Sequence, residues 1–177
     1  MKRYALLLLL TGTAIMIVVM TKTGATLKTA ATPKGIIDLE FANTVNKAMA
    51  ITMAWAPGNG VDNISAAKTN TWLDFIFLVF YSLFLFFTCK KIGRISNSSF
   101  GKAGMLIAKG ALLAGLLDIF ENAGMLYTLS GHLSGNITLF TTTCSIIKWG
   151  LALLAVMYCL TGLVYLLSQQ KLRLLLA

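Results

Sequence analysis

Charge is scarce in this sequence, since only 12% of its 177 residues are charged. That is about half the share found in a soluble domain. Hydrophobic residues make up 57% of the chain, and its mean hydropathy is +0.79. A water-soluble fold is therefore excluded for most of the chain, and the composition indicates an integral membrane protein.

Histidine and catalytic motifs are also lacking. His132 is the only histidine and is expected on a loop surface, so haem ligation by paired histidines is excluded. The chain has no H-E-x-x-H zinc motif, no G-x-S-x-G nucleophile and no phosphate-binding glycine loop. These absences favour a protein without enzymatic activity and leave any cofactor unknown. A membrane enzyme that uses only carboxylates stays an alternative.

Only three cysteines occur, and they match no C-x-x-C pattern. Cys89, Cys144 and Cys159 lie inside or at the edges of apolar segments, which predicts buried and inert thiols. Cys144 and Cys159 are expected about 22 Å apart on one helix, so they cannot form a disulfide with each other. This spacing argues against a quinone-linked disulfide generator.

The net charge of +9 does not indicate nucleic-acid binding, because the basic residues are scattered at the ends of apolar segments. Such residues are typical of the flanks of membrane helices. The expected partner is the lipid bilayer, with other membrane subunits or a second copy of the chain as further candidates. No nucleic-acid partner is expected.

Four apolar segments are long enough to cross a hydrocarbon core of about 30 Å. We expect spans at about residues 4–20, 72–89, 105–129 and 142–167, within a single membrane domain over residues 1–177. The first segment could be a signal peptide, but no clean A-x-A cleavage site follows it, so a retained helix is favoured. The sequence thus predicts an all-α membrane protein, a four-transmembrane-helix bundle.

Residues 21–70 form the only long connection between these spans. Apolar residues recur there at steps of three and four, including Phe41 and Trp55, while Glu40 falls on the polar side. A Thr-Pro pair precedes this stretch and a Pro-Gly-Asn-Gly segment ends it. We therefore expect one extracytoplasmic amphipathic capping helix over about residues 33–56, between spans 1 and 2.

The basic residues also predict the orientation of the spans. Lys90, Lys91 and Arg94 follow the second span, and Lys171 and Arg173 close the chain. By the positive-inside rule these residues face the cytoplasm, so both termini are expected there. The long outer segment carries five lysines of its own, which a long loop tolerates during translocation.

Several polar or charged residues interrupt the apolar spans, where each charged side chain costs at least about 2.5 kcal/mol and needs a partner or a reason. The third span places two acids and an amide on one helix face, at i, i+3 and i+4. Counted at 1.5 Å per residue, the charged groups lie about 4 to 16 Å from the outer boundary. We expect a buried polar network or ligand pocket of Asp74, Tyr81, Asp118, Glu121, Asn122 and Lys148.

One lysine cannot neutralise three carboxylates. At least one acid is therefore expected to be protonated, or the acids to be joined by a cation or water. Two interpretations stay open: the polar residues hold the helices together, or they form a pocket. No metal site is expected from the residue pattern.

Several segments of the sequence resemble a family of small, uncharacterised bacterial four-helix integral membrane proteins. The similar segments are residues 32–42, Ala54-Trp55, Leu73-Asp74-Phe75, Leu117-Asp118-x-x-Glu121-Asn122 and Lys148. The acidic L-D-x-x-E-N motif in the third span is their most distinctive feature. The resemblance covers roughly residues 30–165 and implies a bacterial inner (cytoplasmic) membrane location and no particular reaction.

Small size and the lack of catalytic motifs favour an accessory or interaction subunit of a membrane complex. The alternative is a binding or transport module for a proton, a cation or a polar lipid headgroup, which would use the acidic residues and Lys148.

Overall fold

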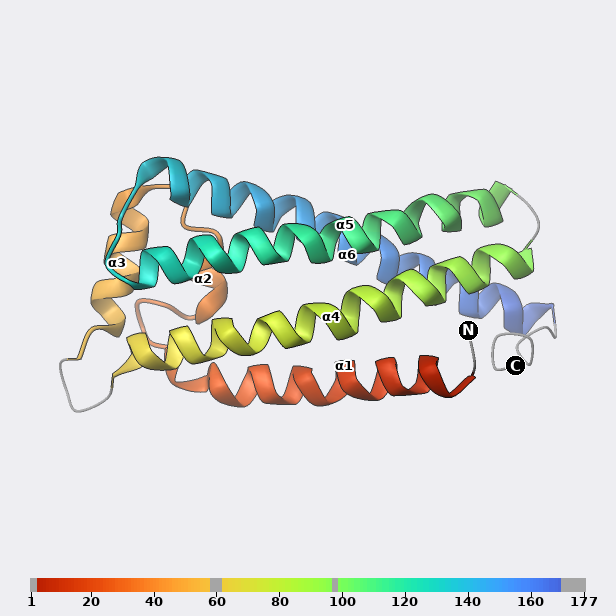
Figure 1. Ribbon diagram of the computed structural model, residues 1–177, viewed down its shortest axis with the longest axis horizontal. Coiled ribbons are helices and arrows are strands. Elements are labelled where there is room, and N and C mark those ends of the chain that lie inside the picture. The colour runs from red at the N-terminus through yellow and green to blue at the C-terminus, as the bar shows by residue number, and fades with distance from the viewer. Residues whose placement is uncertain (1–2, 58–61, 97–98, 170–177) are drawn as a thin grey trace. The chain divides into compact units, whose positions relative to one another are not determined.

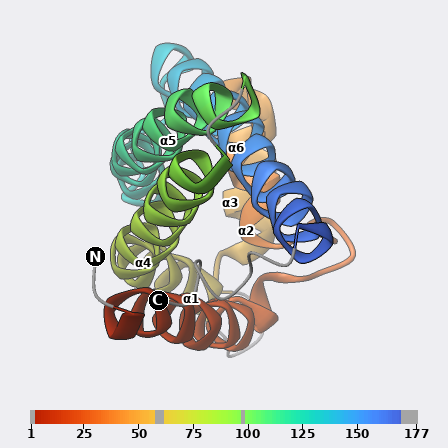
Figure 2. The same ribbon diagram turned by 90° about the vertical axis from the view of Figure 1, so that its right-hand side faces the viewer.

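The computed structural model describes residues 3–57, 62–96 and 99–169, and every regular element in these ranges is a helix (Figures 1 and 2). The long helices are α1 (Arg3–Thr23), α4 (Asn63–Ser96), α5 (Ser99–Leu129) and α6 (Gly135–Ser168). Between α1 and α4 lie a 3-10 helix (Ala25–Leu27), α2 (Ile36–Glu40) and α3 (Val45–Trp55). The predicted helix stop at residues 58–60 and the basic Lys171 and Arg173 fall outside the described ranges.

The four long helices are each long and apolar enough to cross a membrane, which confirms the predicted bundle of four transmembrane helices. Large apolar side chains such as Leu8, Leu106 and Val164 are exposed on them, as is normal for a surface that faces lipid. The helices extend beyond the predicted spans. Helix α4, for example, begins at Asn63, where the Asp62 carboxylate accepts a hydrogen bond of 3.0 Å from the backbone N–H of Ser65.

The chain divides into two compact units, each built from parts of the long helices. Unit 1 comprises Met1–Ala14, Val79–Leu116 and Lys148–Ala177, and unit 2 comprises Ile15–Leu78 and Leu117–Ile147.

Unit 1 is held by close packing of α4, α5 and α6. The Phe100 and Tyr158 rings stack at 4.5 Å, and the Tyr158 hydroxyl donates a hydrogen bond of 3.1 Å to the Phe100 carbonyl oxygen. Near the junction of α4 and α5, a Cβ on Gly93 would lie only 2.8 Å from the Gly101 carbonyl oxygen. Glycine at this position therefore allows the two backbones to approach each other directly.

Unit 2 contains α2 and α3, which pack on the long helices. In Figure 1, α3 lies across the region where α4 begins and α5 ends. The Trp55 indole N–H donates to the Leu27 carbonyl oxygen at 3.0 Å and contacts the Thr32 hydroxyl at 3.1 Å. The Thr32 hydroxyl donates to the same carbonyl oxygen at 2.7 Å. The surrounding apolar core consists of Leu27, Leu39, Ala42, Ala48, Trp55, Ala67, Met125 and Leu129.

The expectation of one helix over residues 33–56 is wrong, because α2 and α3 are separate helices. The backbone N–H of Ala42 bonds to the Leu39 carbonyl oxygen at 3.1 Å, which ends α2 in a tight turn. Thr44 then starts α3 as its N-cap, since its hydroxyl accepts from the backbone N–H of Lys47 at 3.3 Å. Phe41 follows the last residue of α2 as its C-cap and is exposed, although an apolar face was expected there.

Trp55→Phe tests the tie between α3 and the chain that follows α1. We expect it to lower the free energy of unfolding by about 1 to 3 kcal/mol, because the indole donor to Leu27 is lost and the smaller ring fills less of the core. Thermal unfolding of the detergent-purified protein measures the effect. Trp72→Phe is the matched control, since Trp72 is 62% exposed; equal shifts for both variants would contradict the assignment.

Candidate functional site

The acidic motif of the third span lies on the buried face of α5, in unit 2. Asp118 is 2% exposed, and Glu121 and Asn122 are fully buried. Their spacing of three and four residues places them on one helix face, as the sequence predicts. The Asn122 amide donates a hydrogen bond of 2.8 Å to the carboxylate of the half-buried Asp74. A polar contact therefore joins α5 to α4 within this unit.

The other two predicted site residues belong to unit 1. Tyr81 and Lys148 are both buried, and the Lys148 ammonium lies 5.7 Å from the centre of the Trp149 ring. The structure thus brings Asp74, Asp118 and Asn122 together with Glu121 in one unit. The convergence of all six predicted residues in a single pocket stays a prediction.

Hydroxyl groups of α6 bind the end of α2. The Thr142 hydroxyl donates to the backbone carbonyl oxygen of Glu40 at 3.0 Å, and the Ser145 hydroxyl donates to the same oxygen at 3.2 Å. A helix of five residues leaves most of its carbonyl groups without partners inside the helix. Thr142 satisfies the Glu40 carbonyl group and fixes α2 to α6, whereas Ser145 shares its one proton between Glu40 and the Thr141 carbonyl oxygen of its own helix, which lies at 3.0 Å.

Glu40 is the buried acid that the sequence analysis missed. Its expected place was the polar side of an outer helix, but it is 7% exposed and lies where α2 ends against α6. Two local features of the sequence could have indicated this place. Glu40 stands between apolar residues, and Thr44, a residue type favoured at helix N-caps, follows within a few residues. Together these features predict a helix break, which turns the side chain inward.

Asn70 was also missed, and it ties α4 to the end of α1. Its amide donates to the Met20 carbonyl oxygen at 3.0 Å and to the Thr23 hydroxyl at 2.7 Å. Met20 lies in the last turn of α1, and its carbonyl oxygen also accepts from the backbone N–H of Gly24 at 3.0 Å. From the sequence, Asn70 was expected at the end of a polar loop, because the apolar run of the second span begins only after it.

In the described part of the chain, the buried face of α5 and the neighbouring part of α6 carry polar groups but no metal-ligand cluster. Across the described ranges, no group of three or more His, Cys, Asp or Glu side chains is placed to hold a metal ion. The amide oxygen of Asn122 and the hydroxyl of Thr141 are buried without a hydrogen-bond partner among the described residues. Such groups usually bind water or an ion.

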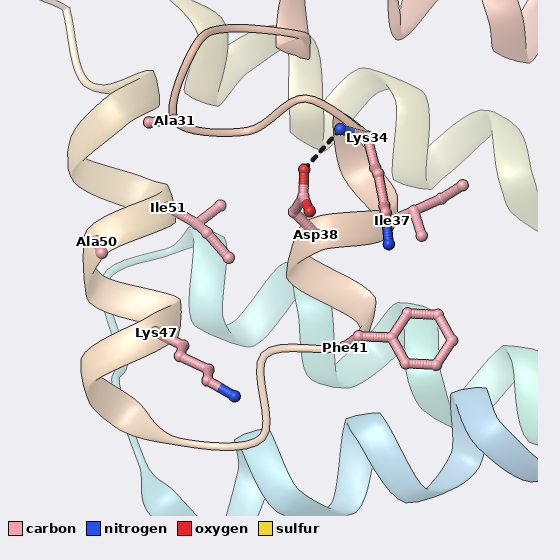
Figure 3. A pocket seen from close by; sticks show the side chains of 8 residues that line it. All are labelled: Ala31, Lys34, Ile37, Asp38, Phe41, Lys47, Ala50 and Ile51. Atoms are coloured by element: carbon pink, nitrogen blue, oxygen red, sulfur yellow. Dashed lines mark hydrogen bonds between the residues drawn. The ribbon is translucent and has the colours of Figure 1, made fainter.

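A separate pocket of about 440 Å³ opens between α2 and α3 (Figure 3). The backbone N–H of Lys34 donates to the Asp38 carboxylate at 2.8 Å, which braces the start of α2. The Lys47 ammonium donates to the Asn43 side chain at 2.9 Å. The pocket is lined by Ala31, Lys34, Ile37, Asp38, Phe41, Lys47, Ala50 and Ile51.

Thr142→Val tests whether α6 holds α2 through the Glu40 carbonyl. We expect a loss of about 0.6 to 1.7 kcal/mol in the free energy of unfolding, the range measured for polar contacts between membrane helices. The segment between α1 and α4 should also become more sensitive to protease, because α2 loses an anchor. Thr143→Val is the control, since the Thr143 hydroxyl is exposed and bonds to Leu139 of its own helix. The same loss in both variants would contradict the role of Thr142.

No protein family model, curated protein or solved structure matches the chain. The resemblance to small bacterial four-helix membrane proteins therefore stays a prediction from sequence, and any function follows from the geometry described above. That geometry is of a multi-pass membrane protein in which the buried Asp118 and Glu121 lie on one face of α5 and the buried Glu40 lies on α2.

Proposed function

We propose that the protein is an accessory or interaction subunit of a larger complex in a bacterial inner membrane. The observation that carries this proposal is the use of the buried polar side chains in unit 2. Asn122 bonds to Asp74, Thr142 bonds to Glu40 and Asn70 bonds to Met20, so each pair joins two different elements of this chain. Polar side chains used in this way hold helices together.

Because the buried polar side chains serve to hold the helices together, the exposed surface is the part of the molecule that is available for binding a partner. With both termini in the cytoplasm, as Lys90, Lys91 and Arg94 at the end of α4 support, α2 and α3 face the outside of the membrane. These helices would cap the outer end of the bundle, where a partner subunit can reach them.

We infer that the partner docks on the pocket between α2 and α3, through an acidic and apolar segment. Residues 21–70 contain five lysines and three acids, one of which is the buried Glu40, so the exposed charge is basic. Phe41 is 41% exposed at the pocket and Met53 is 66% exposed on α3. Aromatic side chains and methionine are enriched at protein interfaces, and opposite charges set the specificity.

A photoreactive amino acid in place of Phe41 tests this docking surface in intact membranes. We expect one discrete cross-linked protein, and we expect Lys47→Glu to reduce its yield severalfold because the charge of the pocket is reversed. Lys28→Glu makes the same charge change in the same outer segment, away from the pocket lining, and should leave the yield unchanged. Cross-links only to lipid would contradict the proposal, and cross-links to a second copy would assign the surface to self-association.

A second candidate is a binding module for a proton or cation, which the buried Asn122 favours. Its amide oxygen has no hydrogen-bond partner among the described residues, and Asp118 lies one helical turn away on the same face. A bound cation or a protonated carboxyl group would satisfy this oxygen.

Thermal stability measured against pH and sodium or calcium concentration separates the two candidates. A binding module predicts that the ion raises the Tm of the parent and that Asp118→Asn abolishes this increase. An interaction subunit predicts that Asp118→Asn, Glu121→Gln and Lys148→Met alter the Tm without any dependence on added cation. Asn136→Asp is the control, since Asn136 is exposed at the start of α6.

A further inference from the structure

Two cysteines from different helices meet in unit 1. The sulfur atoms of Cys89 on α4 and Cys159 on α6 lie 3.5 Å apart. Cys89 is fully buried, and its thiol lies 3.7 Å from the Ala155 carbonyl oxygen, a suitable acceptor. When the Cys89 S–H donates to the Ala155 carbonyl oxygen, the Cys89 sulfur can accept a hydrogen bond from the Cys159 S–H. The sequence argument against a quinone-linked disulfide generator rested on the distance between Cys144 and Cys159, and it does not apply to this pair. The expectation that all three thiols are buried is wrong for Cys159, which is half-buried.

The pair borders an apolar groove of about 360 Å³ between α1, α4 and α6. Cys159 is half-buried and forms part of the groove wall. The volume lies within the range of sites that hold small organic ligands. The groove is lined by Leu6, Leu7, Leu10, Phe84, Leu85, Thr88, Ile92, Val156, Cys159, Leu160 and Leu163.

Thr88 supplies a polar group in this apolar lining. Other hydroxyls of α4 donate to their own helix, as Thr71 does to Ala67 and Ser96 does to Ile92, both at 2.9 Å. The hydroxyl of Thr88 is buried and has no hydrogen-bond partner among the described residues, and the side chain is 8% exposed. A hydroxyl left in this state costs free energy unless a ligand accepts its proton. The groove therefore suits an apolar molecule that carries a carbonyl oxygen.

We propose that the groove binds a lipid-soluble quinone, which oxidises Cys89 and Cys159 to a disulfide. Both S–H bonds break and one S–S bond forms, and the two electrons and two protons reduce the quinone to a hydroquinone. All four species are neutral, so the overall reaction leaves no charge in the apolar surroundings. The Thr88 hydroxyl would donate to one quinone carbonyl oxygen.

The disulfide would join α4 to α6 covalently within unit 1. A disulfide requires about 2 Å between the sulfur atoms, so the pair must close by a further distance of about 1.5 Å, which rotation of the cysteine side chains can supply. The presence of a disulfide between α4 and α6 would thus depend on the oxidation state of the membrane quinones. This role is independent of the docking surface on α2 and α3.

The experiment uses the full chain, reduced and purified in detergent, without oxygen. Decylubiquinone is the probe, because thiols cannot add to its fully substituted ring. Loss of quinone absorbance is followed, and mass spectrometry detects peptides that are joined between Cys89 and Cys159. We expect the joined peptides in the parent and in Cys144→Ser, and their absence in Cys89→Ser and Cys159→Ser.

Thr88→Val tests the groove without touching the thiols. We expect it to slow oxidation by decylubiquinone about fivefold, the effect of losing one hydrogen bond, and to leave oxidation by copper phenanthroline unchanged. Thr161→Val is the control on α6, since the Thr161 hydroxyl bonds to its own helix. Joined peptides with copper phenanthroline but not with the quinone would overturn the quinone site. No joined peptides with either oxidant would overturn the redox pair itself, and equal quinone rates in the parent and Thr88→Val would overturn the role of Thr88.

Discussion

Backbone carbonyl groups at the ends of short helices are the constraint on which unit 2 depends. A carbonyl buried among apolar side chains needs a donor, because water is scarce there and each unsatisfied group costs free energy. Leu27 and Glu40 lie in the segment between α1 and α4, and their carbonyl groups accept hydrogen bonds from the distant side chains of Trp55 and Thr142. This segment is thus fixed in place by the same bonds that make its burial possible.

The two units rely on different interactions. Unit 2 uses hydrogen bonds between elements, which fix direction and distance, as between Asn122 and Asp74. Unit 1 relies more on ring stacking, glycine contacts and a pair of thiols, which suit an apolar environment, and adds the hydrogen bond from Tyr158 to the Phe100 carbonyl oxygen. The more polar unit also contains α2 and α3, the elements that we assign to the outer surface.

The membrane helices and the buried motif of α5 could be predicted because both depend on local patterns. Apolar length identifies a span, and the spacing of Asp118 and Asn122 places them on one face whatever the neighbouring helices do. The break after Glu40 was missed because Phe41 fitted an uninterrupted helical period, although Thr44 carried a capping signal. The pairing of Cys89 with Cys159 could not be predicted, since it depends on which helices become neighbours.

The close glycine contact between α4 and α5 has a consequence for how the protein enters the membrane. Helix α4 ends at Ser96 and α5 begins at Ser99, and the backbones at Gly93 and Gly101 nearly touch. Two apolar helices with so short a connection stay close to each other during synthesis, and the glycines allow them to pack together as soon as both have formed. We therefore expect the translocation machinery to receive them as one helical hairpin, so that α5 enters together with α4 and neither helix waits in the bilayer for a partner.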